Sequence, residues 1–171
     1  MVINPCSFCD ANCCKTYTIT VTVFDIFRIE EGTKKNSSEF AILHPLKILA
    51  YDPDMVLDTA NGAGAYLLGF PSHPCVFLGK DNLCTIHEVA PLSCRRYPYQ
   101  TNDNLNARFC PLPSSLLFRL KRGDIELTDL LWEITEYKKI VKDWNVIKGK
   151  KEDCLRFLLE RARVVKENKI R

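Results

Sequence analysis

The chain has 171 residues, of which 46% are apolar and 26% are charged, an ordinary balance for a globular protein with one sizeable core. A net charge of +3 is too small to favour nucleic-acid binding by itself, and no apolar run is long enough to cross a bilayer. The first residues contain neither a basic n-region nor an apolar h-region, so we expect a cytoplasmic protein.

A cluster of cysteines lies near the start of the chain, at Cys6, Cys9, Cys13 and Cys14, with the spacing C-x2-C-x3-C-C. A Cys-x-x-Cys step lets two sulfurs of a tight turn converge on one metal, and the next thiol can reach it from the following turn. Because adjacent side chains diverge, we expect Cys13 and Cys14 to be ligands of two neighbouring sites. Alternatively, one of them is a ligand and the other is a nearby thiol that does not bind the metal. The alternatives are buried structural cysteines or disulfides, and a cytosolic chain with nine cysteines disfavours disulfides.

The secondary structure after this cluster is predicted from the spacing of apolar residues and from residues that cap helices or form turns. Residues 16–23 alternate between threonine and apolar side chains, which predicts a strand that anchors the cysteine loop. Thr22 and Asp25 predict the start of a helix that ends at Gly32. We then expect a short helix from Ser37 or Ser38 towards His44, turns over residues 51–65, and short strands at residues 66–70 and 76–78.

A second, looser group of cysteines follows at Cys75, Cys84, Cys94 and Cys110, separated by 8, 9 and 15 residues. The turn at residues 79–82 is expected to bring the first two of these thiols together. The nearby histidines, His73 and His87, are weaker ligand candidates, because the thiols already suffice. Arg95 and Arg96 either balance the charge of a thiolate-bound cluster or lie in a solvated turn.

Two amphipathic helices are predicted in the last part of the chain, over residues 124–144 and from about residue 153, with Gly149 as the break between them. Cys154 lies on the apolar face of the second helix and is expected in the core. Residues 148–171 carry nine Lys or Arg against four Asp or Glu. This basic helix either binds an acidic partner or nucleic acid, or simply solvates its outer face.

The cysteine motifs and their flanks carry a resemblance to a known family. The C-x2-C-x3-C-C segment is followed by Thr22-Val-Phe-Asp25, then by Cys75-Val-Phe-Leu and Cys84-Thr-Ile-His-Glu-Val-Ala-Pro-Leu-Ser-Cys94. These motifs, over residues 5–112, resemble the zinc- or iron-chelating cysteine-cluster family, the YkgJ-like proteins often labelled iron–sulfur-cluster-containing. The chain departs from the family pattern at His87, commonly Tyr, and at Ala90, commonly Arg.

The resemblance implies a metal-binding domain that uses eight thiols as ligands, namely Cys6, Cys9, Cys13, Cys14, Cys75, Cys84, Cys94 and Cys110. It does not decide between iron and zinc. Eight thiolates can hold two zinc ions, two clusters, or one centre with thiols in reserve. We favour iron–sulfur, of the [4Fe-4S] type, because the vicinal pair suits clusters and the first group contains no histidine.

The prediction is therefore one α+β domain over residues 1–171, with short strands and cysteine-rich loops in a metal-binding region (residues 5–112) and a helical extension (residues 113–171). We expect an iron–sulfur protein that acts in electron transfer or in cluster or metal delivery to a protein partner, without a membrane or a catalytic constellation of side chains. The alternatives are a zinc-stapled binding module and a non-catalytic subunit of a larger enzyme. Cys9→Ser is expected to lose metal and Cys154→Ser to retain it.

Overall fold

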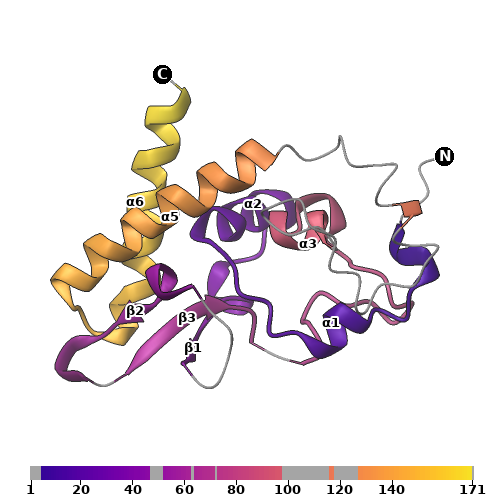
Figure 1. The fold of residues 1–171 in the computed structure, drawn as a ribbon, viewed down its shortest axis with the longest axis horizontal. Coiled ribbons are helices and arrows are strands. Elements are labelled where there is room, and N and C mark those ends of the chain that lie inside the picture. The colour runs from indigo at the N-terminus through magenta and orange to yellow at the C-terminus, as the bar shows by residue number, and fades with distance from the viewer. Residues whose placement is uncertain are drawn as a thin grey trace.

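The computed structural model describes residues 5–46, 52–62, 64–71, 73–97, 116–117 and 127–170. In this part of the chain a three-stranded antiparallel sheet and several helices form the α+β fold that the sequence predicts. Helices α5 (Leu127–Ile147) and α6 (Lys151–Ile170) pack together at one end, the cysteine-bearing segment with α1 (Asn12–Thr16) lies at the other, and α2 (Val23–Thr33) lies between them (Figure 1). Within the described ranges, no helix has the length and apolar character needed to cross a membrane.

The predicted strand over residues 16–23 is wrong. Thr16 ends α1 and Thr22 caps α2, so only the residues between them are extended. They pair with the sheet at a single bridge, Thr20–Gly69, flanked by the bond from the Val21 amide to the Leu68 carbonyl at 3.0 Å. The threonines that produce the alternation are thus used at helix ends as well as along a strand edge.

Helix α2 begins where the sequence predicts. The Thr22 hydroxyl accepts a hydrogen bond from the Asp25 amide at 3.2 Å, and the Asp25 carboxylate accepts one from the Thr22 amide at 2.9 Å. This capping box satisfies amides that the first turn of a helix leaves without partners. The helix ends one residue later than predicted, at Thr33, and Lys34 takes the left-handed conformation with φ 60°.

Close packing against Val89 explains why a glycine occupies position 32, inside α2. A Cβ at this position would lie 2.5 Å from Cγ1 of Val89, whose turn packs on the helix. Gly32→Ala is therefore expected to lower the free energy of unfolding by about 1–3 kcal/mol, although alanine in a helix gains up to about 1 kcal/mol over glycine. Urea unfolding measures this loss, and Gly32→Ala combined with Val89→Ala should recover part of it. Simple addition of the two losses would contradict a clash.

The sheet has the order β1–β3–β2, with β1 (Ile42–Pro45), β2 (Leu57–Asp58) and β3 (Ala65–Gly69). The strand predicted at residues 66–70 is thus confirmed as β3, apart from a shift of one residue. The helix predicted from Ser37 is wrong, since one 3-10 turn (Ser37–Glu39) is followed by β1. The backbone of β1 pairs with β3, and Nε2 of His44 in β1 lies 2.5 Å from the Phe70 carbonyl oxygen. The strand predicted at residues 76–78 is wrong, because residues 76 and 77 form a turn and Leu78 makes only a single bridge.

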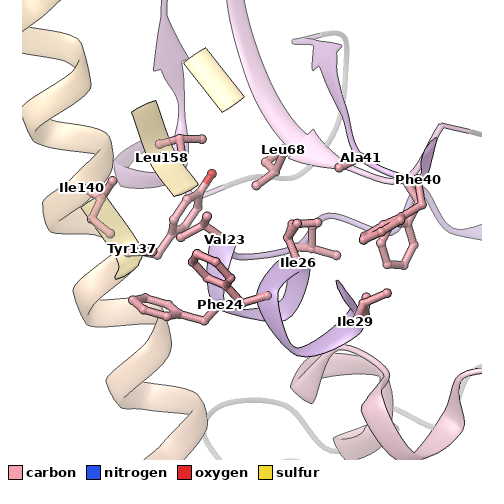
Figure 2. Packing of buried hydrophobic residues seen from close by; sticks show 14 of the residues in the cluster. Val23, Phe24, Ile26, Ile29, Phe40, Ala41, Leu68, Tyr137, Ile140 and Leu158 are labelled. Carbon is pink, nitrogen blue, oxygen red and sulfur yellow. The ribbon is translucent and has the colours of Figure 1, made fainter. Parts of the chain in front are cut away.

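The core joins α2, the sheet and the two long helices (Figure 2). Val23 and Ile26 of α2 lie among Leu68 of β3 and the α5 residues Tyr137 and Ile140 (Figure 2). Polar bonds reinforce the contact of α5 with the sheet. The indole of Trp144 donates to the Asp58 carbonyl at 2.6 Å, and the Asn145 amide donates to the Val56 carbonyl at 2.8 Å and accepts from the Asp58 amide at 2.8 Å.

Cys154 of α6 lies in this core with none of its surface exposed, as predicted. Burial raises the pKa of this thiol from an ordinary value of 9.0 to about 12. Above pH 9 the unfolded chain loses the proton and the folded chain keeps it, so the free energy of unfolding falls as the pH rises towards 12.

Between about pH 8 and pH 10 the unmodified chain should lose about 1 kcal/mol more stability than Cys154→Ala, because only the unmodified chain carries the titrating thiol. Urea unfolding of both chains at the two pH values measures this difference. A difference between them that does not change with pH would contradict a buried, protonated thiol.

Candidate metal centre

One cavity of about 240 Å³ gathers most of the predicted ligands. Its thiols come from the first cysteine cluster, from the hairpin formed by residues 75–84, and from α3 (Leu92–Arg96). The six thiols that line the cavity are Cys6, Cys13, Cys14, Cys75, Cys84 and Cys94. The other walls are mainly apolar, with Phe70, Phe77 and Ile86 among them. Segments that are far apart in the sequence thus place six thiols around one shared space.

The first and second cysteine groups are joined by the backbone. The Cys75 amide donates to the Cys14 carbonyl at 2.8 Å. Cys13 and Cys14 lie on α1, which starts after Ala11 in the left-handed conformation with φ 57°. The two sulfurs lie 3.9 Å apart and both line the cavity. Whether the pair serves two neighbouring sites, or one thiol is a ligand and the other lies beside it, stays a prediction.

The hairpin positions Cys84 as predicted. Leu78 and Cys84 form a bridge, and the Gly79 amide donates to the Leu83 carbonyl at 2.8 Å. Asn82 takes the left-handed conformation with φ 62°, which closes the turn. Cys75 and Cys84 are thereby placed on the walls of the same cavity.

Cys94 is carried by the short helix α3, whose first amide, that of Leu92, donates to the buried Asp25 carboxylate at 3.0 Å. Sequence reasoning identified Asp25 only as a helix-start carboxylate. The capping box was its only signal, because the partner lies 67 positions further along the chain. Tyr17 and Tyr97, which pack edge to face at 6.2 Å and line the cavity, were also missed.

The thiols influence one another electrostatically. The hydrogen bond between the vicinal pair lowers the pKa of Cys13 to about 7 and raises that of Cys14. Burial raises the pKa of Cys75, Cys84 and Cys94. The charge of Asp25 adds to the rise at Cys94, and the charge of neighbouring thiolates adds to it at all three. A cation among these sulfurs would favour the thiolate form of each, so metal uptake would release protons.

The remaining candidates differ in their relation to the cavity. Cys9 is one turn from Cys6, whose carbonyl accepts the Cys9 amide at 3.1 Å, but Cys9 is not among the residues that line the cavity. Cys110 is outside the described residues. His87 and Arg95 line the cavity, whereas His73 Nε2 bonds the Thr18 hydroxyl at 2.9 Å. Within the described ranges, no three Cys, His, Asp or Glu side chains are already close enough to hold one ion.

The predicted role of Cys9 as a metal ligand can be tested separately from that of the cavity thiols. Cys9→Ser is expected to lower the metal content of the purified chain, because serine removes a thiolate next to Cys6. Elemental analysis of this variant beside the unmodified chain measures the loss. Full metal content in the variant would remove Cys9 from the ligand set and leave the cavity thiols as the candidates.

Cations of the basic C-terminal helix are paired within the chain. Lys166 bonds Glu31 at 3.1 Å, and Arg161 bonds Asp143 at 2.8 Å. The ammonium of Lys169 lies 3.8 Å from the centroid of the Trp132 ring. These side chains thus contact neighbouring elements of the same chain, and a role of this helix in binding an acidic partner or nucleic acid stays a prediction.

Six thiols around one mainly apolar cavity, in a small α+β fold, define a cysteine-cluster protein. A family model described as "Putative zinc- or iron-chelating domain" (CxxCxxCC) matches residues 5–111. The match spans more than half of the chain, so the chain belongs to this family, as its resemblance predicts. No curated protein and no solved structure matches the chain. Helices α5 and α6 lie beyond the matched residues.

Proposed function

We propose that the chain holds one or two iron–sulfur clusters of the [4Fe-4S] type and acts in electron transfer or in cluster or metal delivery to a protein partner in the cytoplasm. The observation that supports this is the set of six thiols distributed around a cavity of about 240 Å³. A cluster is larger than a single ion and takes cysteine thiolates from around its surface. The donor type and the space suit such a group, and the thiols would have to move together to bind it, because no three Cys, His, Asp or Glu side chains of the described residues are close enough to hold one ion.

Each part of the cavity has a role in this proposal. The six lining thiols are the proposed ligands, and Cys9 and Cys110 complete the proposed set of eight, enough for two clusters of four thiolates each or for one cluster with thiols in reserve. Phe70, Phe77 and Ile86 limit the access of water, and Arg95 places a positive charge at the wall. Apolar surroundings and nearby charge are among the features that set the reduction potential of a cluster. When bound, an iron–sulfur cluster would supply the redox couple.

Zinc is the second candidate, and one distance favours it. Four sulfurs at about 2.3 Å from a tetrahedral zinc ion lie about 3.8 Å from one another. The sulfurs of Cys13 and Cys14 lie 3.9 Å apart, so this pair would fit one ion. In that case the chain would be a zinc-stapled module whose binding surface lies on the helical extension.

A redox test separates the two candidates. Protein purified without oxygen is treated with dithionite and followed by absorption and electron paramagnetic resonance. An iron–sulfur centre is expected to bleach and to give a paramagnetic signal in one redox state. Protein that contains stoichiometric metal but responds in neither measurement would contradict the redox proposal and favour zinc.

A further inference from the structure

The Asp25 carboxylate hydrogen-bonds both to α2 and its cap and to α3, the helix that carries Cys94. The side chain is almost fully buried, with 3% of its surface exposed. Oδ2 accepts from the Thr22 amide at 2.9 Å and the Thr22 hydroxyl at 3.0 Å. Oδ1 accepts from Arg28 at 2.7 Å and from the Leu92 amide at 3.0 Å. The bonds to Thr22 and Arg28 stay within α2 and its cap, and the bond to Leu92 reaches the helix that carries Cys94.

Helix α3 depends on this bond because it has few supports of its own. It has five residues, and Pro91 at its N-cap makes no side-chain capping bond. An isolated helix of this length is not stable in water, so its position must come from contacts with the rest of the fold. The Leu92–Asp25 bond is buried, and its loss would leave the Leu92 amide without this acceptor. Cys94 follows Leu92 by two residues, on the wall of the cavity.

The same carboxylate is linked to the helical extension. Arg28 pairs with Asp25 through one nitrogen and with Glu133 of α5 through the other. Glu133 is a largely buried side chain, 13% exposed. A chain of contacts therefore runs from α5 through Arg28 and Asp25 to the first amide of α3.

We propose that Asp25 is a positioning residue for the metal centre, which fixes α3 and with it Cys94 against α2, while Arg28 and Glu133 extend this anchor to α5. This inference rests on the proposed role of Cys94 as a ligand. Groups that hold metal ligands in place without touching the metal typically change metal affinity about 10- to 100-fold when they are removed. Asp25 acts on the centre through the Leu92 amide in the same way.

The test compares Asp25→Ala, Asp25→Asn and Thr22→Ala in the full chain, with cobalt(II) as the probe and cobalt–thiolate absorption as the readout. Asp25→Ala should weaken cobalt binding about tenfold or more. Asp25→Asn should rescue part of the affinity, because its amide oxygen can still accept from Leu92. Thr22→Ala removes the capping hydroxyl and its bonds to Asp25 but leaves the Leu92 amide with its acceptor Oδ1, so it should bind about as tightly as the unmodified chain. Equal affinity in all four proteins, or equal losses in Thr22→Ala and Asp25→Ala, would overturn the proposal.

A second readout needs no metal. Amide hydrogen exchange of residues 92–96 in the metal-free chain should be faster in Asp25→Ala than in Thr22→Ala. If Asp25→Ala does not fold, the comparison is made with Asp25→Asn. Unchanged exchange would overturn the anchor itself. An unmodified chain that takes up neither cobalt, iron nor zinc but shows the expected exchange would contradict the proposed metal function and leave the anchor of α3 supported.

Discussion

Cys94→Ser is expected to reduce metal binding by more than about tenfold. The Cys94 thiol lies on the cavity wall with thiols from both cysteine groups. A serine hydroxyl remains protonated at neutral pH and does not replace a thiolate as a ligand for iron or zinc. The variant should be purified without oxygen and its metal content compared with that of the unmodified chain by elemental analysis.

Cys154→Ser is the matched control, because it makes the same chemical change at another buried thiol. Cys154 lies in the core formed with α2, α5 and the sheet, and it does not line the cavity. The control should keep its full metal content, although a buried hydroxyl lowers stability by about 1–3 kcal/mol. Equal loss of metal from both variants would contradict the division of the cysteines into cavity thiols and a core thiol.

Trp144→Ala is expected to lower the free energy of unfolding by about 3–5 kcal/mol. The side chain is 2% exposed and packs against Phe157 of α6, with the ring centroids 5.3 Å apart. Its indole nitrogen donates to the Asp58 carbonyl of β2 at 2.6 Å. The substitution therefore opens a cavity in the contact between α5, α6 and the sheet. Urea unfolding followed by far-ultraviolet circular dichroism measures the loss.

Two further variants serve as comparisons for Trp144→Ala. Trp144→Phe keeps an aromatic ring and removes the hydrogen bond, so it should cost less than alanine. Val146→Ala, at a position that is 79% exposed on the same helix, should change stability by less than about 0.5 kcal/mol. Similar losses for Trp144→Ala and Val146→Ala would contradict the central place of Trp144 in the core.

The elements that the sequence predicts well are those set by local chemistry. Thr22 and Asp25 form a capping box whose partners are three residues apart, and the helical period of the sequence after residue 124 predicts α5 and α6. The turn that places Cys84 follows from Gly79 and Asn82 in the same way. In each case a short stretch of chain contains the interactions that decide its conformation.

The features that the sequence does not predict depend on contacts between distant segments. The alternation before α2 is equally compatible with a full strand, and the single bridge to Gly69 is set by the position of the sheet. The pairing of the Leu92 amide with Asp25 is likewise invisible in sequence spacing. The contact between the Cys75 amide and the Cys14 carbonyl, which joins the two cysteine groups, also links residues far apart in the sequence.

The most direct measurement is the content of iron, zinc and acid-labile sulfide per chain in protein purified without oxygen, together with its absorption spectrum. The cavity thiols and the proposed function predict a coloured protein that contains iron and sulfide and bleaches with dithionite. A colourless protein with stoichiometric zinc and no sulfide would contradict the iron–sulfur proposal. A protein with neither metal, and with no uptake of iron or zinc on reconstitution, would contradict metal binding at the cavity.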